Sequence, residues 1–110
     1  SEARQQGAAV AYRQTVLRAW HEVDDSLAAL QQGRTELDWL SAARDDREVA
    51  LSAQTRAREA GAADDGQVLQ ARQAWLSAEQ ARADAQTAMG LRVVALYRAL
   101  GGGRLAGAQP

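Results

Sequence analysis

The chain of 110 residues contains no cysteine, phenylalanine, isoleucine, lysine or asparagine, and its one proline is the last residue, Pro110. Without cysteine it forms no disulfide and offers no thiolate ligand to a metal. No internal proline breaks a helix, and alanine, the best helix former, supplies much of the apolar content. Helix propensity is therefore favourable almost everywhere in the chain. All thirteen basic residues are arginine and the net charge is −1. Because this balance gives no basic face, we expect no nucleic-acid partner.

Long apolar stretches are also missing, since no run approaches the roughly 20 residues that span a bilayer as a helix. Alanine buries little surface, so we expect narrow helix seams instead of a thick core. A chain of this length forms one domain or a part of one, and as a compact monomer it would be marginally stable.

The first strong pattern extends from about residue 2 to residue 59 and predicts one long helix. Its large apolar residues are separated by 4, 3, 4, 3 and 7 positions, which is the spacing of a helix with one partner-facing stripe. These residues are Val16, Trp20, Val23, Leu27, Leu30 and Leu37.

Residues 60–65 interrupt this pattern and predict a turn. Gly61 suits the left-handed conformation that closes a helix, and Asp64 or Asp65 suits the N-cap of the next helix. A second helix is predicted over about residues 66–100, with Leu69, Leu76 and Tyr97 on a seven-residue spacing. Residues 101–110 lack any period and are expected to form a flexible tail. A turn this short makes the helices antiparallel, so the predicted fold is an all-α coiled-coil hairpin over residues 1–110.

Folding the chain about residue 62 places Leu100 near Asp24, so the first helix would extend about twenty residues beyond the second. The apolar residues around Trp20 would then lack cover. We therefore predict that the chain self-associates, most simply as an antiparallel dimer that forms a four-helix bundle.

Three segments together resemble the C-terminal part of the TolC-like outer membrane efflux channels, in particular the outer membrane factor lipoprotein branch of tripartite pumps. Residues 11–30 are similar to the helix that descends from the membrane barrel in that family. Gly61 followed by Val68-Leu69-Gln70-Ala71-Arg72-Gln73 has the spacing of its periplasmic turn. Leu96-Tyr97-Arg98-Ala99-Leu100, followed by three glycines, resembles its closing motif.

The resemblance implies that this chain is the periplasmic helical hairpin of a longer, homotrimeric protein in the bacterial outer membrane. The hairpins wall an export tunnel, and an adaptor protein docks at the turn and connects the channel to an inner-membrane pump. The expected adaptor-docking residues are Ala60, Gly61, Ala62, Ala63, Asp64, Asp65 and Gly66. Every helical hairpin needs a turn, so a purely structural role for these residues stays open.

Two further sets of residues take expected roles from the resemblance or from the pattern. In the family, acidic residues commonly flank the Val-Leu pair and narrow the tunnel. In this chain Gln67 and Gln70 occupy those positions. The two glutamines are candidates for a tunnel constriction, or they simply belong to the start of the second helix. The helix–helix or oligomer interface is expected at Val16, Trp20, Val23, Leu27, Leu30, Leu37, Leu69, Leu76 and Tyr97.

Other chemistry finds little support in the sequence. His21 has only Asp24 and Asp25 within reach, which are too few ligands for a metal site. Neighbouring aspartates on a helix, such as Asp24 and Asp25, point about 100° apart, so they do not form a pair of carboxylates for acid–base catalysis. We expect Trp20, Trp39 and Trp75 to pack in helix seams. We therefore predict no catalytic residue, no metal and no cofactor. The alternative to a channel segment is a free-standing soluble coiled-coil scaffold without a transport role.

Overall fold

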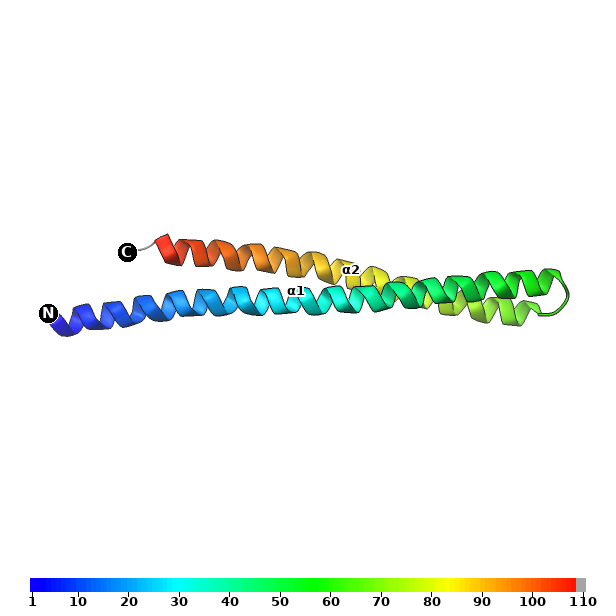
Figure 1. The fold of residues 1–110 in the computed structure, drawn as a ribbon, viewed down its shortest axis with the longest axis horizontal. Helices are drawn as coiled ribbons and strands as arrows, with labels where there is room; N and C mark the ends of the chain where they lie inside the picture. The colour runs from blue at the N-terminus through cyan, green and yellow to red at the C-terminus, as the bar shows by residue number, and fades with distance from the viewer. Residues whose placement is uncertain (109–110) are drawn as a thin grey trace. The chain divides into compact units, whose positions relative to one another are not determined.

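A computed structural model describes residues 1–108 of the chain, with side chains described for residues 1–102. It contains two helices, α1 (Glu2–Glu59) and α2 (Asp65–Ala108), joined by a short turn (Figure 1). No strand occurs in residues 1–108. The predicted all-α helical hairpin is confirmed.

The first helix has the bounds that the sequence predicts, but α2 continues past its expected end at Leu100 to Ala108. Glycine in a helix interior costs about 1 kcal/mol relative to alanine, which weakens a helix without stopping it. Leucine, arginine and alanine follow the three glycines, and no proline occurs before Pro110. The segment expected to be a flexible tail is therefore helical to Ala108, and Gln109 and Pro110 lie outside the described residues.

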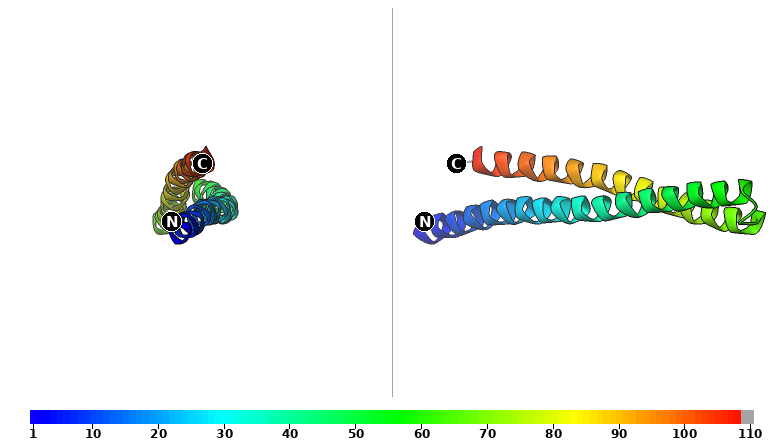
Figure 2. Two further views of the ribbon diagram at one scale, coloured as in Figure 1. Left: turned by 90° about the vertical axis from the view of Figure 1, so that its left-hand side faces the viewer. Right: turned by 45° about the vertical axis from the view of Figure 1, so that its right-hand side comes forward.

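The chain divides into two compact units, a division that the sequence pattern does not indicate. Unit 1 comprises Ser1–Gln32 and Gly90–Pro110, and unit 2 comprises Gly33–Met89. Within unit 2, α1 leads into the turn and α2 returns beside it, as both figures show in green (Figures 1 and 2). Contacts between Arg44 and Glu79 and between Ser41 and Arg82 confirm the antiparallel direction in this unit.

The two helices meet along a seam whose buried and half-buried residues recur at spacings of three and four, with one spacing of seven between Arg44 and Leu51. In unit 1 the seam consists of Val16, Ala19, Val23, Ser26 and Leu30 on α1 and Arg92, Leu96 and Ala99 on α2. In unit 2 it consists of Gly33, Leu37, Leu40, Arg44, Leu51 and Gln54 on α1 and Val68, Ala71, Trp75, Ala78, Arg82, Ala85 and Met89 on α2. Seven of these 21 residues are alanine, glycine or serine, which permit a close approach of the two backbones.

The large apolar residues are only partly in this seam. Val16, Val23, Leu30 and Leu37 lie in it as the stripe predicts, but Trp20 and Leu27 are exposed. On α2 the seven-residue row of Leu69, Leu76 and Tyr97 is exposed, and the neighbouring row that begins at Val68 and Ala71 forms the seam. These exposed residues do not pack between α1 and α2, and their predicted place in an oligomer interface stays a prediction.

The uncovered part of α1 in unit 1 is shorter than the sequence predicts. Ala19 and Val23 are both buried and Val16 is half-buried, so the cover on α1 extends about as far as Val16. Val10 remains half exposed, and Trp20 is exposed because it follows the seam residue Ala19 on the helix surface.

We predict that the seam does not accept a larger side chain. Ala85 is 9% exposed and lies on the seam, whereas Ala83, two residues earlier on the same helix, is exposed. Ala85→Leu should lower the free energy of unfolding by about 1–3 kcal/mol through overpacking. Ala83→Leu, the matched control, should change it by less than about 0.5 kcal/mol. Urea unfolding followed by circular dichroism measures both, and equal effects of the two substitutions would contradict the seam.

Candidate functional site

The turn between the helices is closed by a glycine in the left-handed region. Gly61 has φ of 78°, the value that the sequence prediction for this position requires. Its N–H donates to the carbonyl of Arg58 at 3.0 Å, and the N–H of Ala62 donates to the carbonyl of Ala57 at 2.7 Å. This pair of bonds is a Schellman motif, which satisfies the carbonyl groups that a helix end leaves without partners.

The start of α2 is closed by a reciprocal pair of side-chain hydrogen bonds. The N–H of Gln67 donates to Oδ1 of Asp64, and the N–H of Asp64 donates to Oε1 of Gln67, both at 2.9 Å. This arrangement is a capping box, so Asp64 is the N-cap and Asp65 is the first helical residue. Oδ1 of Asp65 lies 3.5 Å from Nη1 of Arg58, which is a long contact, and both side chains are exposed.

The turn presents small and acidic side chains to solvent. Ala60, Gly61, Ala62, Asp64, Asp65 and Gly66 are exposed, and Ala63 is half-buried. A Cβ added to Gly66 would lie 3.2 Å from Oδ1 of Asp64, so glycine here leaves room for the capping carboxylate. The seven predicted docking residues thus form one largely exposed tip, in which the N–H groups of residues 60–64 are hydrogen-bonded within the chain.

The two glutamines after the turn differ in what they contact. The side chain of Gln67 is held by the capping box at the start of α2. Gln70 is exposed on the first turn and a half of α2, and it follows the exposed Leu69. Sequence reasoning placed Gln67 next to the turn but did not anticipate its bond to Asp64, although the spacing Asp-x-x-Gln is a known capping signal.

A polar contact crosses the seam in unit 2, and the sequence analysis did not find it. Nη1 of Arg44 donates to Oε1 of Glu79 at 2.7 Å, and Nε of Arg82 donates to Oγ of Ser41 at 3.1 Å. The hydrogen bond that Arg44 donates to Glu79 raises the pKa of Arg44; burial opposes this effect, and the charge of Asp45 adds to it. Arg44 stands seven residues from both Leu37 and Leu51, and this spacing is the signal that could have placed it in the seam.

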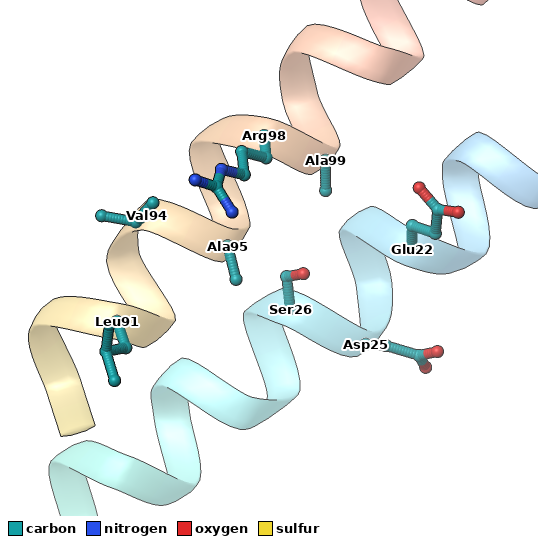
Figure 3. Close-up of a pocket in the computed structure, with 8 residues that line it drawn as sticks. All are labelled: Glu22, Asp25, Ser26, Leu91, Val94, Ala95, Arg98 and Ala99. Carbon is teal, nitrogen blue, oxygen red and sulfur yellow. The ribbon is translucent and has the colours of Figure 1, made fainter.

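An open groove of about 480 Å³ lies between α1 and α2 in unit 1 (Figure 3). Small side chains, those of Ser26, Ala95 and Ala99, lie between the helices, while Glu22 and Arg98 stand at the sides. Its full lining is Glu22, Asp25, Ser26, Leu91, Val94, Ala95, Arg98 and Ala99. The groove is shallow and its polar groups do not converge on one point, so it lacks the form of a small-molecule site.

The remaining candidates for chemistry lie apart from one another. His21 is exposed, and no group of three or more potential metal ligands gathers in the part of the chain that is described. Trp75 is half-buried in the seam as predicted, but Trp20 and Trp39 are 63% and 59% exposed, so the seam prediction is wrong for these two. Neither helix, over its described residues, has a segment apolar enough to cross a membrane.

The sequence profile of the outer membrane efflux protein family matches residues 1–102 of the chain. This match covers α1, the turn and most of α2, so the chain belongs to that family, which is one of channels and transport proteins. No curated protein and no solved structure matches the chain significantly.

We predict that Asp64, and not its neighbour Asp65, holds the start of α2. Asp64→Ala removes the capping carboxylate and should lower the free energy of unfolding by about 1 kcal/mol. Asp65→Ala removes the same charge one residue later and should cost less, because it breaks only a long, exposed contact. Thermal unfolding of both variants tests this order, and a larger loss for Asp65→Ala would contradict the capping box.

Proposed function

We propose that this member of the outer membrane efflux protein family is a periplasmic helical hairpin that forms part of the wall of an export conduit. The observation that carries the proposal is the extent of the family match, which covers α1, the turn and most of α2. In the proposed parent protein, a homotrimer in the bacterial outer membrane, hairpins lie side by side around the conduit. Substrates pass through without covalent chemistry, so the protein is not an enzyme.

The hairpin geometry supports a wall more than a binding pocket. Its seam is narrow and rich in alanine, and its groove in unit 1 is open. Large apolar side chains that the hairpin cannot cover, such as Leu69, Leu76 and Leu91, are available to neighbouring helices. In a conduit the contacts with neighbours would bury them.

The turn is the proposed docking point for a periplasmic adaptor, which connects the channel to an inner-membrane pump. The Schellman motif and the capping box fix the backbone of the turn, so docking costs little ordering entropy. The adaptor would contact small side chains at Ala60 and Ala62 and the carboxylates of Asp64 and Asp65. A partner surface with small apolar and basic residues fits this chemistry.

The adaptor proposal is tested by cysteine crosslinking in intact cells, since residues 1–110 contain no cysteine. Ala62→Cys in the parent protein should form an adduct with a cysteine placed on the adaptor. Gln14→Cys, an exposed position near the other end of α1, should form none. Adducts from Gln14→Cys alone, or from neither position although the channel assembles, would overturn docking at the turn. If the parent protein neither reaches the outer membrane nor supports export, the alternative hypothesis of a free-standing coiled-coil scaffold without a transport role would hold instead.

A narrowing of the conduit near the start of α2, at Gln67 and Gln70, is the finer part of the proposal. Both side chains are neutral amides, so they do not attract cations as carboxylates at the same positions would. Gln70 is the better candidate to face the opening, because Gln67 is engaged by Asp64.

We predict that a carboxylate at Gln70 makes the channel more selective for cations. Gln70→Glu would place one negative charge per subunit near the opening, where a ring of charges acts on passing ions. Gln86→Glu makes the same change at an exposed position farther along α2 and serves as the control. Conductance of the parent protein in planar bilayers, with a salt gradient, measures the cation-to-anion permeability ratio. An unchanged ratio for Gln70→Glu would place the narrowing elsewhere.

A further inference from the structure

The seam of unit 2 contains four polar residues to which each helix contributes one arginine and one acceptor. Arg44 on α1 donates to Glu79 on α2 at 2.7 Å. In the opposite direction, Arg82 on α2 donates to Ser41 on α1 at 3.1 Å. We call these four residues the polar layer. On each helix the arginine stands three positions after the acceptor, so the two partly buried bonds form a reciprocal pair across the seam.

Both bonds of the polar layer lie on one side of the seam. The two arginines are seam residues, and each acceptor directly follows a seam residue: Ser41 follows Leu40, and Glu79 follows Ala78. Successive helix residues are about 100° apart, and in antiparallel helices the residues that follow the seam share the same side of it. The polar layer therefore depends on the angle at which α2 faces α1.

Within unit 2, α2 has two neighbouring rows of residues that could face α1. The row observed in the seam begins at Val68 and includes Trp75. The second row, one position later, begins at Leu69 and includes Leu76. Each row has two large apolar side chains between residues 68 and 83, so apolar size does not choose between them. The observed row even has a disadvantage, because among the described residues the indole N–H of Trp75 is buried without a hydrogen-bond partner.

The two rows differ in their charges. Between residues 68 and 83 the observed row contains only Arg82, whereas the second row contains Arg72 and Glu79. A rotation of α2 by one position would carry both of these charges into the seam. Arg72 is seven residues from Glu79, and Leu51 is seven residues from Arg44, in each case toward the hairpin turn. Because Arg44 and Glu79 are bonded, Arg72 would then be level with Leu51, which offers no acceptor, and a charge removed from water in this way is expensive.

The same rotation would also break the polar layer. Arg82 would move to the side that precedes the seam, away from Ser41, so their hydrogen bond would be lost. The side chain of Glu79, which is 36% exposed, would leave its partly hydrated position for the seam itself. Its pair with Arg44 would then be more deeply buried, and the cost of removing both charges from water rises with burial.

We propose that the polar layer, together with Arg72, selects the face of α2 that meets α1 and so keeps Leu69 and Leu76 outside the seam. These charged residues are positioning residues, and they act on the pairing of the helices more than on its strength, because partly exposed ion pairs stabilise a fold little. The proposal concerns the hairpin itself and does not depend on the conduit function.

The test is the rate at which a single introduced thiol reacts with a maleimide, since residues 1–110 contain no cysteine. Ala85 belongs to the observed row and is 9% exposed, whereas Ala83 belongs to the second row and is exposed. Ala83→Cys should react at least about tenfold faster than Ala85→Cys, because a buried thiol reacts only when the seam opens. Adding Arg72→Leu and Glu79→Leu removes both charges from the second row, and the order of the two rates should then reverse.

Asp46→Leu combined with Arg56→Leu is the matched control. Both residues are exposed, and they stand two positions after the seam residues Arg44 and Gln54, about 200° around α1 from the seam. The control removes one charge of each sign and adds two leucines, as the test pair does, but it leaves both rows of α2 intact. The original order of the rates should therefore persist. Rates are compared at two chain concentrations, since cover by another copy would change with concentration and the seam of one hairpin would not.

A milder pair of substitutions keeps the proposal testable if the leucine variant aggregates. Arg72→Gln with Glu79→Gln removes both charges without adding apolar surface, and it should lower the ratio of the two rates by about threefold, the effect expected of partly exposed charges. Circular dichroism checks that each variant is helical. An unchanged order of rates in a helical chain with the two leucines, an unchanged ratio with the two glutamines, or a reversed order in the control would each overturn the proposal.

Discussion

The most buried positions between α1 and α2 hold mainly small side chains, and several other features of the hairpin follow from this contact. Ala19 and Ala99 in unit 1, and Ala85 in unit 2, are buried although each offers only a methyl group. Such residues let two helices approach closely, and they leave no room between the helices for most of the large side chains. Trp20, Leu76 and Tyr97 therefore lie outside the seam, where a hairpin alone cannot bury them.

The parts of this fold that sequence could predict are those that local chemistry determines. Absence of proline and abundance of alanine predict the helices, and Gly61 predicts the left-handed residue at the turn, because few other residues adopt that conformation at low cost. The seam could not be predicted from residue size. One of its rows on α2, which begins at Val68, lies one position before the row of Leu69, Leu76 and Tyr97, and only the packing of both helices together decides between them.

Two other features, the end of α2 and the position of Arg44, were not predicted for a common reason. In both, the preference of a residue for a local structure or for solvent is weaker than the effect of its neighbours. The three glycines after Leu100 disfavour a helix, yet the residues beyond them favour one enough for α2 to reach Ala108. Arg44 is charged, and charge suggests an exposed position, but Glu79 on the facing helix offers it a carboxylate at 2.7 Å. The partner lies 35 residues away in the chain, so no local reading of the sequence connects the two.

A hairpin of this kind does not derive its stability from a core, and this bears on how a conduit built from it would behave. Six of the residues with described side chains are buried, and four of them are alanine or glycine. In the proposed conduit, apolar contacts with neighbouring hairpins would contribute a large share of the free energy that holds each helix in place, so assembly and folding would be linked equilibria. In the proposed conduit, a change at the turn would alter how hairpins contact their neighbours without breaking a core. The rigid turn, held by Gly61 and Asp64, is suited to transmit such a change, because its own geometry need not be rebuilt when a partner binds.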